Sequence, residues 1–367
     1  MTPRLTMIIH SLNGGGAEHS VAMLANAWTA AGNAVTIITL DTPDTDIYRL
    51  DAQVQRIGLH GMQHSQNVVQ AIWNNFRRLR GLRAAIRAAR GDHVISFTEK
   101  MNVLSILAMP GKSVIACERT DPRRHAVGPV WSALRRLTYR RARAIVVQTR
   151  AVSDYARRFV PSVPIHVIPN AVQANDLDVP RGQVIIGLGR LAHEKGFDLL
   201  IESFAAVAAQ YPSWQLVIYG EGPERQALQA RIEHHGLSQR IALPGWTDNP
   251  QLALASARIF VLPSRYEGFP NGLLEAMAAS LAVVSFNCDS GPREIIRHEQ
   301  DGLLVTPARV DELATALASL LCDESLRTRL AENARSVVER FSIERHLAGW
   351  EEVLASGPNS TQKVQAP

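Results

Sequence analysis

Short apolar runs alternate with amphipathic segments along most of the chain. Runs rich in Val, Ile and Leu predict strands at residues 5–12, 34–40, 92–97, 112–117, 144–148 and 165–168, and again at 184–188, 214–219, 240–243, 259–262, 282–286 and 302–305. Helical spacing of apolar positions predicts helices between them, for example at 17–31, 152–159 and 310–321. Strands that alternate with helices favour parallel sheets with helices on both faces.

The two series of strands predict an α/β protein with two doubly wound, Rossmann-like domains. The stretch 169–180 is rich in Pro, Asn and Asp and predicts the linker, so we place the domains at 1–172 and 173–345. Ligands of such sheets bind at the carboxyl ends of the strands, and the cleft between two facing domains is the expected site. Residues 356–367 predict a disordered tail.

The overall composition favours a cytosolic globular protein. Of the 367 residues 46% are hydrophobic and 20% charged, and no apolar run approaches the roughly 18 residues that span a bilayer. The first residues lack the pattern of a signal peptide. Three scattered cysteines fit neither a disulfide framework nor a zinc site.

Positive charge is concentrated in the first half of the chain. Residues 1–175 hold 22 Lys and Arg against 10 Asp and Glu, whereas residues 176–367 hold 17 against 24. The excess is almost entirely arginine, which favours a partner rich in phosphate, either lipid headgroups or a nucleic acid. The alternative is a set of solvated helix faces.

Three segments that follow predicted strands carry residues suited to binding anions or polyols. Gly14, Gly15 and Gly16 precede a helix, where glycines allow close approach of a ligand and the helix N-terminus attracts anions, although a tight turn would use the same residues. Arg190 and Lys195 follow the strand at 184–188, and two cations there suit a diphosphate. The alternative for them is a surface salt bridge with Glu194.

The run 263–277 is the most informative of these segments. Glu267 follows the strand at 259–262, and Glu275 lies in the first turns of the next helix, which Asn271 or Gly272 is expected to cap. Loop amides at that helix start suit a phosphate, and the two carboxylates suit two separate polyol groups. The alternative for Glu275 is that it only complements the helix dipole.

These motifs resemble those of the retaining glycosyltransferases of family 4, which have the GT-B fold. The resemblance rests on Glu267-x7-Glu275, on the Gly189–Gly196 loop and on the N-terminal Gly-Gly-Ala-Glu. It includes Gly220-Glu221-Gly222-Pro223 and Gly245-Trp246, and it covers about residues 5–350. It implies a helix at 346–355 that crosses back to the N-terminal domain, which would bind the acceptor while the C-terminal domain binds the nucleotide-sugar.

The resemblance also implies roles for individual residues. Arg190 and Lys195 would neutralise the diphosphate leaving group, Glu275 would bind the ribose hydroxyls, and Glu267 would contact the donor sugar. The implied donor-binding set is Gly15, Gly16, Arg190, Lys195, Gly268, Phe269, Pro270, Asn271 and Glu275, and the implied catalytic set is Glu267, Arg190, Lys195 and Glu118. We expect no cofactor and no metal, although Asp-x-Asp strings occur at 44–46 and 176–178.

Two further segments resemble a subset of the family that acts on lipid-linked glycans. They are Cys117–Pro122 and Ser290–Ile295, and that subset often uses UDP-galactose or UDP-N-acetylgalactosamine-type donors. Many family members carry a histidine near the first segment, where this chain has Glu118 and Arg119. We expect Glu118 in catalysis and Arg119 at the acceptor.

A helix at residues 73–87 is expected to face an anionic membrane. Its apolar residues, Trp73, Phe76, Leu79, Leu82 and Ile86, are interleaved with arginines that include Arg78, Arg80 and Arg83. Docking there would bring a polyprenyl-diphosphate-linked sugar to a cytoplasmic enzyme that is peripheral on the inner membrane.

The activity implied by the resemblance is transfer of a hexose or N-acetylhexosamine from a nucleotide-sugar, first of all a UDP-sugar, to a lipid-linked saccharide. Such transfer would serve surface polysaccharide, lipopolysaccharide or glycan biosynthesis. Retention without an evident nucleophile suggests front-face attack by the acceptor hydroxyl. Two alternatives stay open: a UDP-sugar epimerase of the same fold, and a basic nucleic-acid-binding protein, although no nucleic-acid motif is recognised.

Overall fold

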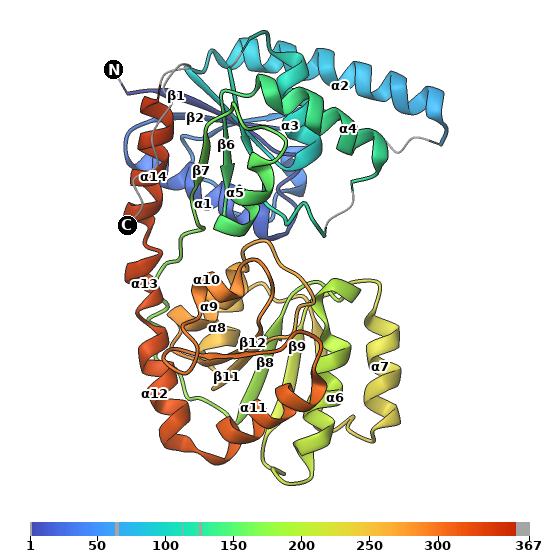
Figure 1. The fold of residues 1–367 in the computed structure, drawn as a ribbon, viewed down its shortest axis with the longest axis vertical. Coiled ribbons are helices and arrows are strands. Elements are labelled where there is room, and N and C mark those ends of the chain that lie inside the picture. The colour runs from blue at the N-terminus through green and yellow to red at the C-terminus, as the bar shows by residue number, and fades with distance from the viewer. Residues whose placement is uncertain (1, 63–65, 112, 125–126, 357–367) are drawn as a thin grey trace. The chain divides into compact units, whose positions relative to one another are not determined.

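The chain divides into two compact units, each built on one parallel sheet (Figure 1). A computed structural model describes residues 2–62, 66–111, 113–124 and 127–356. The first unit comprises Met1–Asn170 and Ile343–Pro367, and the second is Ala171–Ser342. All of the predicted tail at 356–367 except Ser356 lies outside the described residues. The two parallel sheets confirm the expected α/β fold class.

The first unit contains a seven-stranded parallel sheet in the order β3-β2-β1-β4-β5-β6-β7. Its strands are β1 (Arg4–Ile8), β2 (Ala34–Thr39), β3 (Gln55–Gly58), β4 (His93–Phe97), β5 (Val114–Cys117), β6 (Ala144–Val147) and β7 (Ile165–Val167). Six of them overlap the predicted apolar runs, and β1 begins one residue before its run. The exception is β3, a short edge strand with an exposed or half-buried, partly polar sequence, which pairs with β2 from Thr36↔Gln55 onwards.

Helices cover both faces of this sheet. The elements are α1 (Gly16–Ala30), η1 (Pro43–Thr45), α2 (Val68–Ala89), α3 (Glu99–Ala108), α4 (Pro129–Thr138), η2 (Tyr139–Arg141), α5 (Arg150–Arg157) and α14 (Ile343–Ala355). Apolar side chains of α2, α3 and α5 join one core, whereas those of α1 and α14 join the other. The chain therefore returns at its end to pack on the unit where it began.

The second unit contains a six-stranded parallel sheet in the order β10-β9-β8-β11-β12-β13. Its strands are β8 (Val184–Leu188), β9 (Gln215–Tyr219), β10 (Ile241–Gly245), β11 (Ile259–Leu262), β12 (Ala282–Phe286) and β13 (Leu303–Val305). All six match predicted runs. The order reverses between β8 and β11, and such a switch point is where ligands of open parallel sheets bind.

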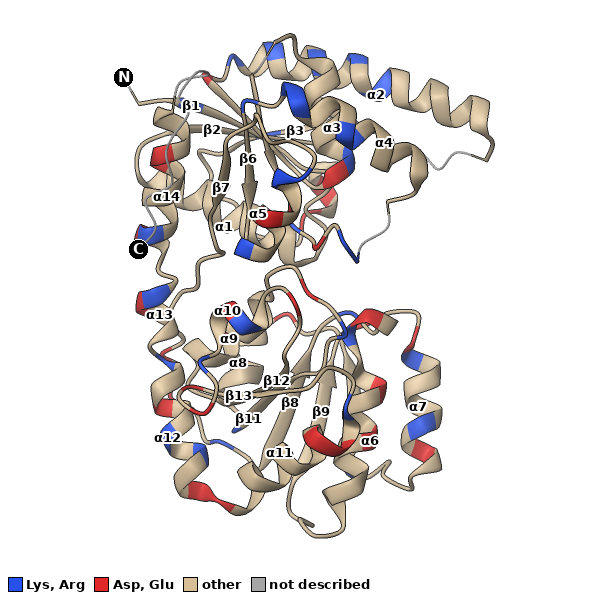
Figure 2. Cartoon of the chain, viewed as in Figure 1, with Lys and Arg blue, Asp and Glu red and all other residues tan. Residues whose placement is uncertain are grey.

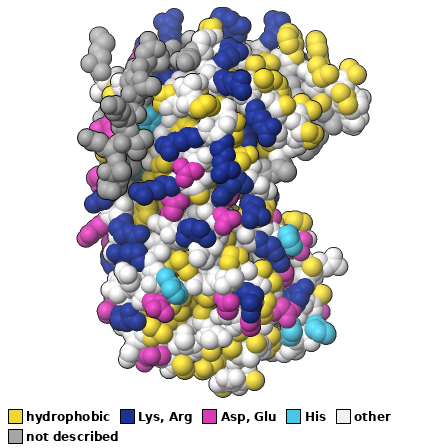
Figure 3. Space-filling model, in the orientation of Figure 1, with side chains coloured by type: hydrophobic (Ala, Val, Ile, Leu, Met, Phe, Trp, Pro, Cys, Tyr) yellow, Lys and Arg dark blue, Asp and Glu magenta, His cyan; other side chains and the backbone are white. Residues whose placement is uncertain are grey.

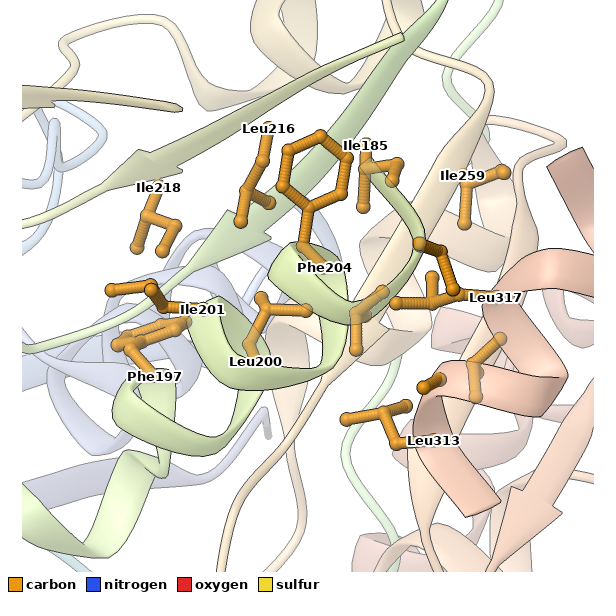
Figure 4. Close-up of a cluster of buried hydrophobic side chains, with 14 of the residues drawn as sticks. Ile185, Phe197, Leu200, Ile201, Phe204, Leu216, Ile218, Ile259, Leu313 and Leu317 are labelled. Carbon is orange, nitrogen blue, oxygen red and sulfur yellow. The ribbon is translucent and has the colours of Figure 1, made fainter. Parts of the chain in front are cut away.

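The helices of the second unit bury its central strands. They are η3 (His193–Lys195), α6 (Phe197–Ala208), α7 (Arg225–His234), α8 (Pro250–Ala255), α9 (Asn271–Ala278), α10 (Pro292–Ile295), α11 (Val310–Cys322), α12 (Glu324–Ala334) and α13 (Val337–Arg340). Figure 4 shows Phe204 and Leu200 of α6 packed with side chains of the sheet and with Leu317 of α11. This core holds rigid the strand ends that precede the candidate site.

Helix α14 is fixed to the first unit near its beginning, in its middle and at its end. His346 Nδ1–H donates to the Pro169 carbonyl (2.6 Å), and Trp350 Nε1–H donates to His346 Nε2 (3.1 Å). The Trp350 ring also packs edge-on against Trp28 at 5.4 Å. At the C-terminal end, Arg143 Nη2 donates to the carbonyl of Leu354 (2.7 Å). A cation that binds terminal carbonyls stabilises a helix end.

The buried His346 is expected to make the protein less stable at acidic pH. Burial is the largest influence, and it lowers the pKa of His346 to about 4, while both ring nitrogens have partners that require the neutral ring. The unfolded chain has an ordinary value near 6.5, so it binds a proton first as the pH falls. The contribution of neutral His346 to the free energy of unfolding is complete above pH ~6.5. Up to about 3 kcal/mol of that free energy is lost as the pH falls toward about 4.

Urea unfolding of the wild type and of His346→Gln at pH 7 and pH 4.5 checks this expectation. The variant is less stable at pH 7 but should lose less stability on acidification than the wild type. His234→Gln, on the exposed surface of α7, is the control that keeps the wild-type dependence on pH. Parallel losses in the wild type and His346→Gln would contradict the assignment.

Candidate functional site

Loops at the carboxyl ends of β8, β9 and β11 lie against one another in the second unit. Gly196 has φ 65°, and a Cβ there would lie 2.0 Å from the Pro263 carbonyl oxygen of the next loop. Gly220 has φ 140°, and its Cβ would lie 1.9 Å from the Gly189 oxygen. Glycine is required at both positions by these close approaches and by the backbone conformation. The three loops therefore form one connected edge at the switch point.

A lysine–glutamate pair lies at the centre of this edge. Lys195 Nζ is 2.7 Å from Glu267 Oε1, which also accepts the Ser264 hydroxyl at 2.6 Å. The Glu267 side chain is 8% exposed, so the pair is largely removed from water. Burial strengthens the attraction between the two charges and fixes their positions. The structure thus brings together two of the residues that the sequence assigned to one site.

The second predicted cation has its own carboxylate partner. Arg190 Nη2 donates to Glu194 Oε1 across one turn of the loop, so the salt bridge considered from the sequence is present. The Arg190 side chain is 68% exposed, which leaves its guanidinium accessible to a ligand in solution. A salt bridge and a ligand site are therefore compatible at this residue.

Arg265 fixes the loop that carries these cations, a role that the sequence did not reveal. Its guanidinium binds both oxygens of Asp198 at 2.8 and 2.7 Å and also donates to the His193 carbonyl at 2.7 Å. The backbone N–H of Arg265 donates to the Glu194 carbonyl at 2.9 Å. The run 263–277 contains Arg265, but its partner Asp198 lies 67 residues away, so only the fold identifies the pair.

Helix α9 begins one residue earlier than its predicted caps allow. Pro270 is the N-cap without a side-chain hydrogen bond, and Asn271 is already helical, so the expected capping by Asn271 or Gly272 is wrong. Proline fixes the backbone before the first turn. The N–H groups of that turn remain suited to an anion. Glu275 lies half-buried in the second turn of the helix.

The loop after β12 supports the segment Gly268–Asn271. The Ser290 hydroxyl donates to the Gly268 carbonyl at 3.1 Å, and Gly291 has φ 88° with its Cβ position 2.8 Å from the Pro270 ring. The Phe269 ring packs edge-on against Phe341 at 5.6 Å. The first two residues of the predicted segment Ser290–Ile295 therefore support the loop Gly268–Asn271, for which donor binding stays a prediction.

Gly15 and Gly16 lie in the first unit, at the start of α1. Gly15 has φ 133° and exchanges hydrogen bonds with the Tyr48 hydroxyl, through its N–H (3.2 Å) and its carbonyl (3.0 Å). A Cβ at Gly15 would lie 2.5 Å from Glu18 Oε2. A carboxylate is therefore already present at this helix N-terminus, and binding of a phosphate by the two glycines stays a prediction.

Glu118 lies inside a buried polar cluster of the first unit. It is 3.8 Å from Arg135, and Glu99, Asn102 and Tyr139 complete its surroundings. Burial raises the pKa of Glu118 to about 7, with a smaller contribution from the negative charge of Glu99. One Glu118 oxygen lacks a hydrogen-bond partner among the described residues. The Glu118 carboxyl is thus buried among residues of the first unit, and its catalytic role stays a prediction.

Arg119 is buried and separate from the arginines of α2 with which it was grouped. Its Nη2 donates to Asn170 Oδ1 at 2.6 Å, and its guanidinium lies 5.8 Å from the centre of the Phe97 ring. Burial lowers the pKa of Arg119 to about 10, which leaves it charged at neutral pH. Its position ties the segment after β5 to Asn170, the last residue before the second unit.

The exposed residues of α2 are divided along its length rather than interleaved. Figure 2 shows arginines on the C-terminal part of the helix, and Figure 3 shows apolar side chains at its N-terminal end. The exposed apolar side chains there include two aromatic ones, Trp73 at 58% and Phe76 at 48%. Leu82 and Ile86 instead lie in the core, because they face the sheet. The expected amphipathic helix is therefore an apolar end followed by a basic stretch.

The three arginines of α2 assigned to acceptor or membrane also differ from one another. Arg78 donates from Nε to the Gly61 carbonyl at 2.8 Å and is half-buried. Arg80 and Arg83 are exposed, and Arg80 lies over the Phe76 ring at 5.8 Å. Arg78 therefore fixes the loop at Gly61, and the positive charge on the exposed face of α2 comes from residues such as Arg80 and Arg83.

The acidic strings at 44–46 and 176–178 take part in ion pairs. Asp46 binds Arg56 at 2.8 Å, and Asp176 binds Arg335. In the described part of the chain no three His, Cys, Asp or Glu side chains gather as a metal site would require.

Comparisons with known proteins match both units. Residues 14–176 match the family described as Glycosyltransferase Family 4, and residues 174–337 match Glycosyl transferases group 1. A lipopolysaccharide core biosynthesis glycosyltransferase, LpsE of Rhizobium meliloti, is 33% identical over 61% of this chain and 67% of its own length. An α-1,4-N-acetyl-D-galactosaminyltransferase of Campylobacter jejuni, named for a diNAcBac-PP-undecaprenol glycan, is 26% identical over 97% of this chain and 99% of its own.

A solved structure shares the fold across nearly the whole chain. A mutant of TarM from S. aureus, in complex with fondaparinux, α-GlcNAc-glycerol and UDP, has a TM-score of 0.82 at 16% identity and covers 97% of this chain and 100% of its own.

Proposed function

We propose a reaction for this chain, which belongs to family 4 of the glycosyltransferases. The protein transfers a hexose or N-acetylhexosamine from a UDP-sugar to a lipid-linked saccharide, with retention of configuration. The observation that carries the proposal is the edge formed by Lys195, Arg190 and Glu267 at the switch point of the second sheet. Two cations and a carboxylate are the groups that a sugar joined to a diphosphate requires.

The charges suit the bond that breaks. As the anomeric carbon separates from the β-phosphate oxygen, negative charge grows on the diphosphate, and the fixed ammonium of Lys195 and the guanidinium of Arg190 stabilise it. Glu267 accepts hydrogen bonds from the donor sugar, and Glu275 accepts those of the ribose hydroxyls. N–H groups at the start of α9, following Gly268–Pro270, bind phosphate oxygens.

The acceptor hydroxyl attacks the anomeric carbon from the face that the diphosphate leaves. The new glycosidic bond forms as the old bond breaks, and the hydroxyl proton passes to the departing phosphate oxygen, so neither a protein nucleophile nor a general base is assigned. Because two cations already offset the leaving charge, we propose that transfer needs no divalent metal. Both residues that stabilise the leaving group, Lys195 and Arg190, lie in the second unit.

The relatives support this choice of donor and acceptor. The C. jejuni enzyme is named for a polyprenyl-diphosphate-linked glycan, LpsE for the lipopolysaccharide core, and the TarM structure contains UDP. No comparable observation favours an epimerase or a nucleic-acid binder.

A transfer assay in EDTA tests the proposal. UDP-galactose, UDP-glucose and their N-acetylated forms are offered with a polyprenyl-diphosphate-linked saccharide, and NMR of the product gives its anomeric configuration. An α-linked product supports retention. An inverted product, or activity that depends on added Mg²⁺ or Mn²⁺, would contradict the respective part of the proposal.

We further propose that the first unit binds the acceptor and docks on the cytoplasmic face of an anionic membrane through α2. None of the helices in the described part of the chain is long and apolar enough to span a bilayer. The apolar end of α2 offers Ile72, Trp73 and Phe76, and the adjoining Arg80 and Arg83 supply positive charge. Exposed aromatic residues next to arginines are typical of helices that lie at a membrane interface.

Two double variants test the docking surface. Trp73→Asn/Phe76→Asn removes exposed apolar area that docking would bury in the membrane, and Arg80→Glu/Arg83→Glu reverses the charge of the basic stretch. Each double variant is expected to lower co-sedimentation with phosphatidylglycerol vesicles at least about tenfold. Arg157→Glu/Arg158→Glu is the control: it makes the same charge change at two exposed arginines, the last residue of α5 and its C-cap. Equal losses in the control and the α2 charge variant would mean that overall charge, rather than this helix, governs binding.

A further inference from the structure

Both cations of the candidate donor site are already paired with carboxylates. Lys195 is bound by Glu267, whose carboxylate is needed for the donor sugar, and Arg190 is bound by Glu194. The function proposed above gives Glu194 no part in transfer. Yet it lies one residue from Lys195, and its side chain contacts the cation that must reach the diphosphate.

The carboxylate is the fixed member of the Arg190–Glu194 pair. The Glu194 side chain is 21% exposed against 68% for Arg190. Its backbone is fixed because its carbonyl accepts the Arg265 N–H at 2.9 Å and Arg265 also binds Asp198. Burial alone would raise the pKa of Glu194, but hydrogen bonds from Arg190 and from its own amide, with the charges of Arg190 and Lys195, hold that pKa below its usual range. The carboxylate is therefore ionised at neutral pH, and Arg190 is the more exposed member of the pair.

A diphosphate competes with Glu194 for the same guanidinium. A guanidinium binds a carboxylate or a phosphate through the same fork of N–H donors. We propose that Glu194 is a resident counter-ion of Arg190, displaced by the diphosphate of the donor, and that it weakens binding of the free nucleoside diphosphate. This inference rests on the proposed function, because it requires a diphosphate at Arg190.

The charge of the two ligands makes the effect selective. A nucleoside diphosphate ends in a phosphate monoester, whose second ionisation lies near pH 6, so at neutral pH it carries about one more negative charge than the sugar conjugate. A fixed carboxylate repels the more highly charged species more strongly. Glu194 therefore disfavours the product relative to the donor, which assists release of the product after transfer.

Calorimetric titration with UDP and with a UDP-sugar tests the inference in the full-length protein. Glu194→Gln keeps the size of the side chain and removes its charge, so we expect it to bind UDP about three- to tenfold more tightly, with a smaller gain for the UDP-sugar. Glu202→Gln is the matched control, because Glu202 also pairs with an arginine, Arg231, in the same unit. It should leave both affinities unchanged.

A double-mutant cycle with Arg190→Gln identifies the cause of the gain. If Glu194 acts by occupying Arg190, the Glu194→Gln gain disappears when Arg190 is absent. An equal gain in both backgrounds, or no gain in the wild-type background, would overturn the counter-ion role while leaving the donor site intact. If the wild-type protein shows neither binding heat nor a thermal shift with UDP or a UDP-sugar, the proposed function is overturned, and this inference with it.

Discussion

Replacing Lys195 with alanine is expected to lower kcat for sugar transfer by about 10²- to 10³-fold, the range found when one preorganised stabiliser of developing charge is removed. The ammonium group lies 2.7 Å from Glu267 Oε1, in a position fixed by burial and by the Arg265 clamp on its loop. In the variant, the Ser264 hydroxyl is the hydrogen-bond partner left to the buried Glu267 carboxylate among the described residues, so the negative charge of Glu267 opposes the leaving group.

Steady-state rates at saturating donor check this expectation. Lys195→Arg keeps the charge with a different reach and should recover part of the activity. Lys100→Ala, an exposed lysine of α3 in the other unit, is the matched control and should retain wild-type kcat. A Lys195→Ala enzyme that transfers sugar within about tenfold of the wild-type rate would remove Lys195 from the catalytic set.

Gly196→Ala is expected to destabilise the second unit by about 3 kcal/mol or more and to weaken binding of UDP at least about tenfold, because a left-handed backbone and a steric clash act together. Gly196 has φ 65°, and the added Cβ would lie 2.0 Å from the Pro263 carbonyl oxygen. Relief of the clash must separate the loop carrying Lys195 from the loop carrying Glu267, so the cost falls on the site itself.

Gly236 provides a matched control with the same backbone conformation. It also has φ 65°, but a Cβ there meets no atom within 4 Å. Gly236→Ala is therefore expected to lower the free energy of unfolding by about 1–2 kcal/mol, through the left-handed backbone alone, and to bind UDP normally. Urea unfolding and calorimetry compare the two variants directly. Equal destabilisation of both, with unchanged UDP affinity, would show that the close approach of the two loops is unimportant.

The apolar pattern predicted the parallel sheets because central strands of such sheets are buried on both faces. Twelve of the thirteen strands coincide with the predicted runs, as the bounds of β8 and β11 illustrate. The exception, β3, is a four-residue edge strand whose Arg56 binds Asp41 and Asp46. The place of β3 in the sheet is supported by ion pairs of a polar side chain, which a pattern of apolar residues does not report.

The candidate site was predictable where residue type and loop position decide the chemistry. Glu267 and Lys195 follow neighbouring strands, and the structure brings them into contact. Burial was the part that the sequence did not reveal. Glu118 and Arg119 follow a strand as loop residues do, yet partners from other elements enclose both. Burial also explains the difference at α2. The sequence predicted interleaved apolar and basic residues along this helix, but Leu82 and Ile86 face the sheet, so the exposed surface has an apolar end and a basic stretch.

We propose that the edge at β8 and β11 binds the diphosphate of a UDP-sugar without metal. The most direct test is a thermal-shift panel of UDP, GDP and their sugar conjugates in EDTA, for the wild type and Glu275→Ala. A ligand at 100 times its Kd stabilises by roughly 2.7 kcal/mol, which is readily measured. We expect UDP or a UDP-sugar to shift the wild type, and Glu275→Ala to bind it about 10- to 100-fold more weakly because hydrogen bonds to a charged group are lost. No shift with any nucleotide, or a shift that requires a divalent cation, would contradict metal-free binding of the donor at this edge.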